Sequence, residues 1–236
     1  IRLRAEVQLL LLHGVNNTPN AWLSVRNLLE EHGHECITVF LPASNSVDDI
    51  ATQILQGLPL GQYWVVGHSF GGMVALALAQ LAPERTAGVA LVNSSVTADT
   101  EMARSARAER VLKAEAGQYA ELANAASDRA YHPANKGRPD LLEAREVDIA
   151  AYGAERYIAH QKAMACRPDR SQFLRDFSAP KLAVIAEGDV VIPAESQAIV
   201  ALECGMSIVK IPLAGHMLPM EQPAALASAL LTWVEN

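Results

Sequence analysis

The sequence has few of the features that mark membrane-spanning, disulfide-linked or metal-binding proteins. Its densest apolar run, residues 7–12, is interrupted by Gln8 and is far shorter than the roughly 20 residues that a membrane-spanning helix needs. The chain contains only three cysteines, Cys36, Cys166 and Cys204, and they are widely spaced without a C-x-x-C pair. This spacing favours reduced packing residues over a disulfide framework or a zinc site. We therefore expect a cytoplasmic protein with no membrane span, no metal and no cofactor.

Basic charge is scarce as well. The 236 residues include 19 Lys and Arg against 26 Asp and Glu, which leaves a net charge of −7. No Lys/Arg cluster with interleaved aromatic residues is present, and an acidic surface repels phosphate groups, so we do not expect nucleic acid as a partner. Acidic and basic residues balance between positions 94 and 178, so the negative excess lies in the two flanking parts. The length suits one main domain with an insertion.

Short apolar runs alternate with helix-like patterns before position 95 and again after position 179. The runs that we interpret as buried strands are residues 7–12, 35–41, 63–66, 88–92, 182–186 and 207–211. The helix candidates are residues 20–31, 47–57, 70–81, 194–202 and 224–234. Strands buried on both faces that alternate with helices are typical of a parallel sheet joined by right-handed crossovers. The pattern predicts an α/β fold with a mostly parallel, six-stranded sheet flanked by helices.

The middle of the chain, residues 95–179, has no convincing strand. Its pattern indicates several short helices with breaks at Gly117, 132–133, Gly137, Pro139, Gly153 and Pro168. We interpret it as a helical cap inserted into a core of residues 1–94 and 180–236. Aromatic side chains at helical spacing more often pack in a core than line a ligand pocket. Tyr131 and Tyr157 of this cap are nevertheless candidate pocket residues.

Residues 67–71 fit the pattern G-x-S-x-G, which places a serine at a sharp turn from a strand into a helix. Such a serine adopts a strained backbone conformation, and flanking residues without a Cβ let neighbouring chains pass close by. The free N–H groups at the start of the helix suit a developing negative charge at the same point. A phosphate-binding turn is the alternative, but neither G-x-G-x-x-G nor G-K-[ST] is present.

An acid and a histidine follow this serine in the order that the pattern requires. Asp189 comes just after the fifth predicted strand and four residues before Pro193, and the pair 215–216 (Gly-His) comes soon after the sixth. With the His-Gly pair at 13–14 and Glu-Gln-Pro at 221–223, these motifs make nearly the whole chain resemble the α/β-hydrolase superfamily. That fold hosts esterases, lactonases, lyases and receptors, so the resemblance does not identify a substrate.

The resemblance implies a triad in which Ser69 is the nucleophile, His216 is the base and Asp189 orients the imidazole. The chemistry asks for the same roles, because a serine hydroxyl is a poor nucleophile at neutral pH and a hydrogen-bonded imidazole can accept its proton. Glu187 is a second candidate for the acid, although it lies on the predicted strand itself.

The resemblance also implies an oxyanion hole of two backbone N–H groups, those of Val15 and Phe70. His13 precedes the first of these groups, and we expect it to brace that loop by hydrogen bonds. Asn16 and Met217 are candidate pocket residues, because Asn16 follows the first donor and Met217 follows the predicted base. An Asn in a loop is more often a turn former, and that alternative stays open.

The remaining histidines have no pattern that points to chemistry. We expect His68 to be structural, and His32, His34, His132 and His160 to lie on solvated helix ends or loops. No i, i+4 pair among the histidines indicates a metal site.

These observations predict a serine hydrolase that cleaves a small carboxylic ester, lactone or thioester through an acyl-enzyme, so the expected partner is a small-molecule ester. Residues 33–44 are similar to plant methylesterases and hydroxynitrile lyases, so a lyase or another C–C bond-cleaving enzyme on the same triad is one alternative. Met217 stands where those lyases have a lysine. The other alternative is a receptor that binds a ligand on this fold without turnover.

Overall fold

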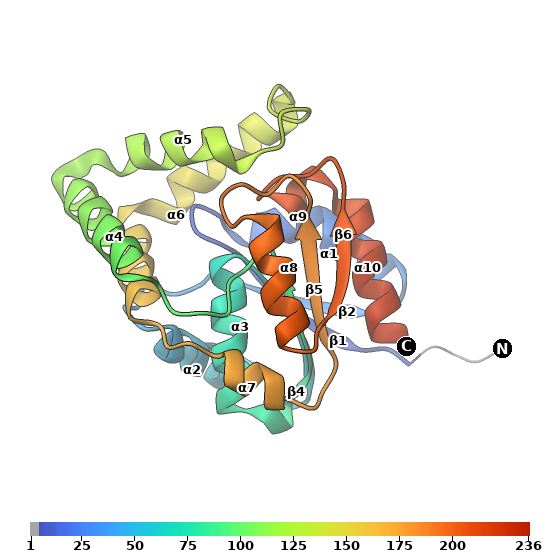
Figure 1. The fold of residues 1–236 in the computed structure, drawn as a ribbon. Coiled ribbons are helices and arrows are strands. Elements are labelled where there is room, and N and C mark those ends of the chain that lie inside the picture. The colour runs from blue at the N-terminus through green and yellow to red at the C-terminus, as the bar shows by residue number, and fades with distance from the viewer. Residues whose placement is uncertain (1–4) are drawn as a thin grey trace.

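Six parallel strands form the centre of the molecule (Figure 1). The computed structural model describes residues 5–236. The strands are β1 (Gln8–Leu12), β2 (Glu35–Val39), β3 (Tyr63–His68), β4 (Thr86–Val92), β5 (Lys181–Ala186) and β6 (Ser207–Ile211). They lie in the order β2-β1-β3-β4-β5-β6, and every neighbouring pair is parallel. The carboxyl ends of all six strands therefore meet at one edge of the sheet.

Helices cover both faces of this sheet, as the sequence predicts. Leu9 and Leu11 of β1 belong to one apolar cluster, and Leu10 and Leu12 belong to another, because alternate side chains of a strand point to opposite faces. The helices on the first face are α1 (Leu23–Glu31), which follows a 3₁₀ turn (Pro19–Trp22), and α10 (Pro223–Glu235), which follows the short α9 (Leu218–Glu221). Those on the second face are α2 (Val47–Gly57), α3 (Phe70–Leu81) and α8 (Ala194–Glu203).

Helices α2 and α3 have the bounds that the sequence predicts. Ser46 caps α2 by accepting a hydrogen bond from the Asp49 N–H at 3.3 Å, and two acidic residues in the first turn suit the positive end of the helix. The strands also lie where predicted, with ends that differ by roughly two residues. The expectation that every strand is buried on both faces is wrong for β2 and β6, because they are the edges of the sheet and are partly exposed.

Residues 95–179, here called the helical segment, connect β4 to β5 and contain helices but no strand. The elements are α4 (Glu101–Lys113), a π-helical turn (Ala114–Gln118), α5 (Tyr119–Ala130), α6 (Pro139–Cys166) and α7 (Ser171–Asp176). The predicted breaks at Gly117 and Gly153 are kinks, with φ angles of 88° and 78°. Although α6 spans 28 residues, Gly153 has a non-helical φ of 78° and ψ of 165°, so α6 consists of two shorter helices that meet at the predicted break.

Part of the helical segment lies beyond the carboxyl ends of the strands, where Figure 1 shows α5 and α6 past the arrowhead of β5, whereas α7 lies near the opposite end of β5. The segment's own apolar cluster contains Tyr119, Tyr152 and Tyr157 and packs against Val15 and Phe40 of the sheet region. The division into a cap of residues 95–179 and a core of residues 1–94 and 180–236 stays a proposal, and residues 1–4 of that core lie outside those described. Within residues 5–236, every helix is too short or too polar to cross a membrane.

Three histidines are buried without charge in this fold. Burial lowers the pKa of His13 and of His68 to about 3 and that of His160 to about 4. His160 is fully buried on α6, where its Nδ1 lies 2.6 Å from the Tyr152 hydroxyl and its Nε2 lies 2.8 Å from the Pro42 carbonyl oxygen. The expectation that His160 and His34 are solvated is therefore wrong, since His34 is also buried, between β2 and the end of α10. Helix docking, which sequence periodicity does not encode, places both rings inside.

The turn between β3 and α3 has room only for glycine at two positions. A Cβ at Gly67 would lie 2.2 Å from the Gly71 carbonyl oxygen, and a Cβ at Gly71 would lie 2.3 Å from the Leu12 carbonyl oxygen. Both obstacles are backbone atoms, which cannot rotate away as a flexible side chain can. The end of β1 and the start of α3 are therefore in direct backbone contact.

We expect Gly71→Ala to lower the free energy of unfolding by about 3 kcal/mol, because the added methyl group forces β1 and α3 apart. Gly57→Ala is the matched control, since a Cβ there meets nothing within 4 Å and alanine favours the last turn of α2. Urea denaturation of both variants measures the difference. Equal midpoints would show that the turn can relax.

Acid should destabilise the fold through the buried histidines. In the unfolded chain a histidine has a pKa of about 6.5. Between about pH 6.5 and pH 4 these histidines are therefore protonated in the unfolded state but remain neutral in the folded state. Stability therefore falls as the pH falls, by about 2 kcal/mol per buried histidine between about pH 7 and pH 5. Urea denaturation across this range should show a shallower slope for His160→Gln and an unchanged slope for His32→Gln, an exposed control. A wild-type stability that does not change with pH would contradict the assignment.

Candidate active site

Ser69 occupies the turn between β3 and α3 in a strained conformation. Its φ of 53° and ψ of −119° lie outside the regions that side-chain-bearing residues favour. The Ser69 N–H donates to the Val92 carbonyl at 2.9 Å, and the Ser69 carbonyl accepts from the Gly72 N–H at 2.9 Å and the Ser94 hydroxyl at 2.6 Å. These bonds hold the backbone, so the position of Oγ is determined by the surrounding strands.

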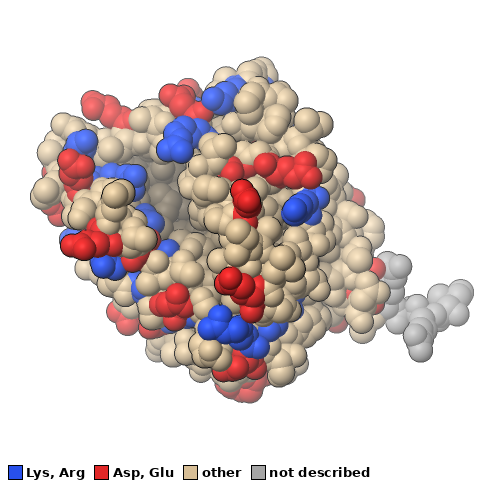
Figure 2. All heavy atoms as spheres, viewed as in Figure 1, with Lys and Arg blue, Asp and Glu red and all other residues tan. Residues whose placement is uncertain are grey.

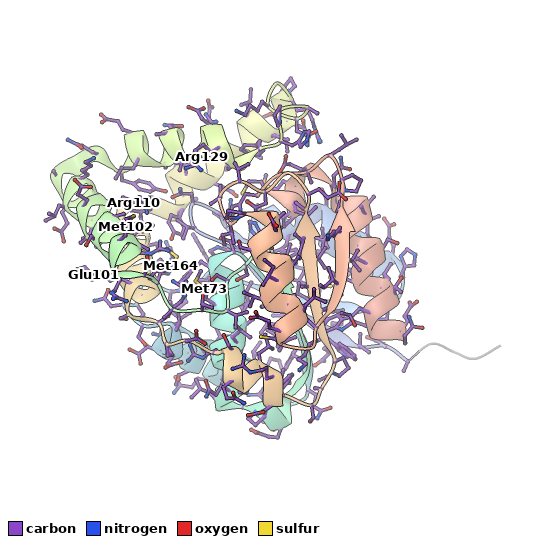
Figure 3. The ribbon with its side chains drawn as sticks, in the orientation of Figure 1. Met73, Glu101, Met102, Arg110, Arg129 and Met164 are labelled. Carbon is purple, nitrogen blue, oxygen red and sulfur yellow. The ribbon has the colours of Figure 1, made fainter. Side chains whose placement is uncertain are left out.

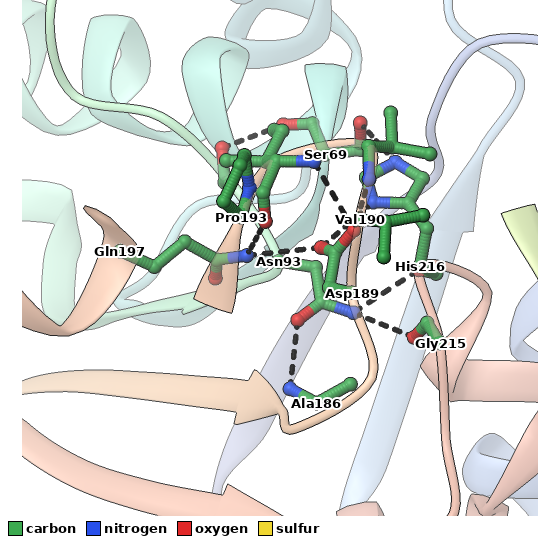
Figure 4. Close-up of polar contacts among 12 residues, drawn as sticks. Ser69, Asn93, Ala186, Asp189, Val190, Pro193, Gln197, Gly215 and His216 are labelled. Atoms are coloured by element: carbon green, nitrogen blue, oxygen red, sulfur yellow. Dashed lines mark hydrogen bonds and ion pairs between the residues drawn. The ribbon is translucent and has the colours of Figure 1, made fainter. Parts of the chain in front are cut away.

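The structure brings Ser69, His216 and Asp189 together in one chain of hydrogen bonds (Figure 4). The distance from Ser69 Oγ to His216 Nε2 is 2.9 Å, and the distance from His216 Nδ1 to Asp189 Oδ2 is also 2.9 Å. His216 and Asp189 are buried, being 8% and 3% exposed. Because a carboxylate only accepts, Nδ1 carries a proton and Nε2 is left as the acceptor for the serine hydroxyl.

Four hydrogen-bond donors hold the carboxylate of Asp189, a residue that follows β5. Its Oδ1 accepts from the backbone N–H groups of Val191 at 2.9 Å and Ile192 at 3.1 Å, and its Oδ2 accepts from Gln197 Nε2 at 2.9 Å as well as from His216. Glu187, the second candidate for the acid, is exposed and lies apart from this network. Of the two candidate acids, Asp189 is therefore the one that is hydrogen-bonded to His216.

The loop that carries His216 is anchored by buried polar side chains. The carbonyl oxygen of His216 accepts a hydrogen bond from Asn93 Nδ2 at 3.1 Å. The same oxygen lies 2.7 Å from His68 Nε2, so His68 donates to it as the Nε2–H tautomer. Glu221 is 2% exposed and accepts from the Gly215 N–H at 2.9 Å. The structural role expected for His68 agrees with these contacts.

Sequence reasoning did not assign roles to Asn93, Gln197 or Glu221 as side chains that support the triad. The only signals were the position of Asn93 directly after β4 and the place of Glu221 in the Glu-Gln-Pro motif. Asn93 also has a positive φ of 46°, and its Oδ1 accepts from the Ala186 N–H at 2.9 Å. It thus ties β4, β5 and the His216 loop together.

His13 braces the loop that contains Val15. Its Nε2 accepts from the Leu41 N–H at 3.0 Å and its Nδ1 lies 2.9 Å from the Gly14 carbonyl oxygen, so the neutral ring donates to that carbonyl. In a planar trans peptide the Gly14 carbonyl and the Val15 N–H point in opposite directions, so this bond turns the Val15 N–H away from His13. A Cβ at Gly14 would lie 3.2 Å from Ser69 Cβ, which places this loop directly beside the serine.

A cavity of about 580 Å³ opens in front of Ser69, between α3 and the helical segment. Figure 2 shows a hollow in this face with Lys and Arg side chains around it, and Figure 3 places Met73 and Met164 on one side and Arg110 and Arg129 on another. The apolar lining includes Val15, Met73, Leu122, Met164, Val191 and Ile192, and the polar lining includes Asn16, Ser69, Arg107, Arg110, Arg129, Tyr157 and Gln161. A cleft of this size suits a small or medium-sized organic ligand.

Two of the four predicted pocket residues line this cavity, and two do not. Asn16 and Tyr157 are part of the lining. Tyr131 and Met217 instead pack together with Leu141 in a separate apolar cluster, so the expectation that they line the pocket is wrong for this cavity. The Met217 N–H donates to the Ala130 carbonyl at 3.1 Å, which ties the residue after His216 to the end of α5.

The sequence matches a family model and resembles proteins of named activity. The model of the "Alpha/beta hydrolase family" matches residues 9–229. A protein from Haemophilus influenzae named as a 2-succinyl-6-hydroxy-2,4-cyclohexadiene-1-carboxylate synthase is 25% identical over 232 residues, which cover 89% of this chain and 90% of that protein. A protein from Klebsiella pneumoniae named as a carbamate hydrolase is 26% identical over 224 residues, which cover 86% of this chain and 82% of that protein.

Solved structures share the same fold. A thermophilic esterase from Thermogutta terrifontis has a TM-score of 0.89 at 24% identity, over 98% of this chain and 90% of the esterase. The enol-lactonase from Burkholderia xenovorans has a TM-score of 0.87 at 17% identity, over 100% of this chain and 94% of the lactonase. With the family model matching most of the chain, this protein belongs to the alpha/beta hydrolase family.

Proposed function

We propose that the protein is a serine hydrolase that cleaves a small carboxylic ester, lactone or thioester through an acyl-enzyme on Ser69. The single observation that carries the proposal is the hydrogen-bonded chain from Ser69 Oγ through His216 to Asp189, which opens onto a cavity. A serine is activated in this way when an adjacent base is itself oriented by a third group.

In the proposed reaction Ser69 Oγ attacks the carbonyl carbon of the substrate while its proton moves to His216 Nε2. Asp189 stabilises the imidazolium ion that forms, and the imidazolium then gives the proton to the leaving alcohol as the carbon–oxygen bond breaks. A water molecule attacks the acyl-enzyme by the same route, with His216 again taking and returning the proton. An ester gives a carboxylic acid and an alcohol, a lactone gives a hydroxy acid, and a thioester gives a carboxylic acid and a thiol, and Ser69 is restored in each case.

The negative oxygen of the tetrahedral intermediate would lie between the N–H groups of Val15 and Phe70. Phe70 is the first residue of α3, so its N–H belongs to the helix turn that has no intrahelical acceptor, and the positive end of the helix favours an anion there. The His13 bond to the Gly14 carbonyl supports the role of the other donor, because it holds the peptide that carries the Val15 N–H. Preorganised donors of this kind contribute strongly to acyl transfer.

A carbamate is a second candidate substrate, favoured by the 26% identity to the Klebsiella pneumoniae protein named as a carbamate hydrolase. A carbamate carbonyl offers the same electrophilic carbon and the same developing oxyanion as an ester. The lyase alternative has less support, because no lysine is found among the described residues that line the cavity.

Ser69 should react covalently with diisopropyl fluorophosphate. We expect mass spectrometry to find the adduct on the peptide that contains Ser69, and no adduct in Ser69→Ala. With p-nitrophenyl acetate as substrate, Ser69→Ala should lower kcat by about 10⁴-fold to 10⁶-fold, whereas Ser105→Ala, an exposed serine on α4, should leave the rate unchanged. A folded wild-type protein that hydrolyses the ester no faster than Ser69→Ala would instead favour the receptor alternative.

Asp189→Asn should lower kcat for the same ester by about 10⁴-fold, because an amide at this position stabilises the wrong imidazole tautomer and no imidazolium. KM should change little, since the side chain does not line the cavity. Glu187→Gln is the matched control and should retain wild-type kcat. If Glu187→Gln were the more damaging change, the acid would have to be reassigned.

A further inference from the structure

The cavity in front of Ser69 is lined by three arginines and by no acidic residue. Arg107 and Arg110 come from α4, and Arg129 comes from the last turn of α5. Figure 3 shows Arg110 and Arg129 on the helices that face α3, which carries Met73. The mechanism described above uses none of these guanidinium groups.

Arg107 is already paired within the protein. Its Nε lies 2.5 Å from Asp99 Oδ2, and the same carboxylate accepts from Arg167 at 2.7 Å. Burial alone would raise the pKa of Asp99, but the hydrogen bonds from Arg107 and Arg167 hold it below its ordinary value, so Asp99 stays ionised. Arg107 also contacts the side-chain oxygen of Gln161 at 3.2 Å. It therefore serves as part of the wall.

Arg110 and Arg129 have no such partner in the part of the chain that the structure describes. No carboxylate in residues 5–236 lies within 4.0 Å of either guanidinium, and Arg129 makes only a 3.3 Å hydrogen bond to the Val190 carbonyl. The helix itself offers no acid either. On the same face of α4, the residues three and four positions from Arg110 are Arg107, Lys113 and two alanines. On α5, the residues three and four positions before Arg129 are both alanines.

The positive charge acts inside the cavity as well as at its mouth. Burial raises the pKa of the Tyr157 phenol, which lines the cavity, and the charges of Arg110 and Arg107 oppose that rise. Arg110 and Arg129 are themselves exposed, so they stand at the entrance where a ligand would pass. A planar guanidinium binds a carboxylate through two parallel N–H donors, which gives orientation as well as affinity.

We infer that Arg110 and Arg129 form an anion subsite for a carboxylate on the substrate, on the side of the cavity that the helical segment lines. This inference rests on the proposed function, because the subsite matters for turnover only if Ser69 attacks an ester in the same cavity. A substrate held at both ends has its carboxylate at the arginines and its ester carbonyl at Ser69. The residues thus select a half-ester of a dicarboxylic acid, or an ester or lactone of similar charge, over a neutral ester of the same size.

The test compares mono-p-nitrophenyl glutarate with its methyl ester, which has the same acyl chain and no charge. The wild-type protein should show a kcat/KM about tenfold higher for the anionic ester, mainly through a lower KM. The Arg110→Gln/Arg129→Gln variant should lose this preference, because its kcat/KM for the anionic ester should fall about tenfold, to the value for the neutral ester. Raising the ionic strength from about 0.01 M to about 1 M, which shortens the Debye length from about 30 Å to about 3 Å, should reduce the wild-type preference.

Lys113→Gln/Lys136→Gln is the matched control, because it removes two exposed charges from the helical segment without changing the cavity lining. It should retain the preference. Equal kcat/KM values for the two esters in the wild type, or a preference that survives in the arginine variant, would overturn the subsite while the hydrolysis of the neutral ester upheld the proposed function.

A binding measurement covers the case in which neither ester is hydrolysed, which would contradict the proposed function. Calorimetric titration of Ser69→Ala with the two esters should show a dissociation constant about tenfold lower for the anionic one, and this difference should disappear when Arg110→Gln and Arg129→Gln are added. Equal affinities of Ser69→Ala for both esters would overturn the subsite independently of turnover.

Discussion

The imidazole of His216 needs a hydrogen-bond partner on each nitrogen, and the sheet is built so that both are present. Ser69 follows β3 and Asp189 follows β5, and β4 lies between these strands. A parallel strand rises about 3.3 Å per residue, whereas a hydrogen bond tolerates a range of only about 0.5 Å. A shift of one residue in the register of either strand would therefore separate the ring from a partner, so strand register is the constraint on which the site depends.

Strain and buried polarity are concentrated at this same edge of the sheet. Ser69 and Asn93 both have a positive φ, and they end neighbouring strands. Such backbone conformations persist only where the surroundings determine them, and hydrogen bonds hold Ser69 to Val92 and Ser94 and hold Asn93 to Ala186 and His216. The buried side chains of Gln197 and Glu221 hold the neighbouring Asp189 and Gly215 in the same way. A buried polar group that loses its partner costs more than its hydrogen bond contributes. These side chains therefore act together, and the proposed triad of Ser69, His216 and Asp189 depends on them for its rigidity.

Much of the architecture could be predicted from local patterns. The alternation of apolar runs with helix-like patterns predicts the six-stranded sheet and the bounds of α2 and α3, and Ser46 caps α2 where that helix is predicted to begin. The order of Ser69, Asp189 and His216 was readable because each follows a strand. The burial of His160 and the placement of Tyr131 and Met217 away from the cavity were not, because both depend on how α5 and α6 dock onto the sheet region.

The cavity is lined by two parts of the chain that are far apart in the sequence. The sheet edge and α3 supply Ser69 and an apolar wall, and the helical segment supplies the cations. The chain as a whole is acidic, with a net charge of −7, so its distant surface repels an anion. Screening limits that repulsion to about 8 Å at physiological ionic strength, and among the described residues the charged side chains that line the cavity are guanidinium groups. Local charge, rather than net charge, then governs what enters, and helices outside the sheet can alter it without disturbing the register that the imidazole requires.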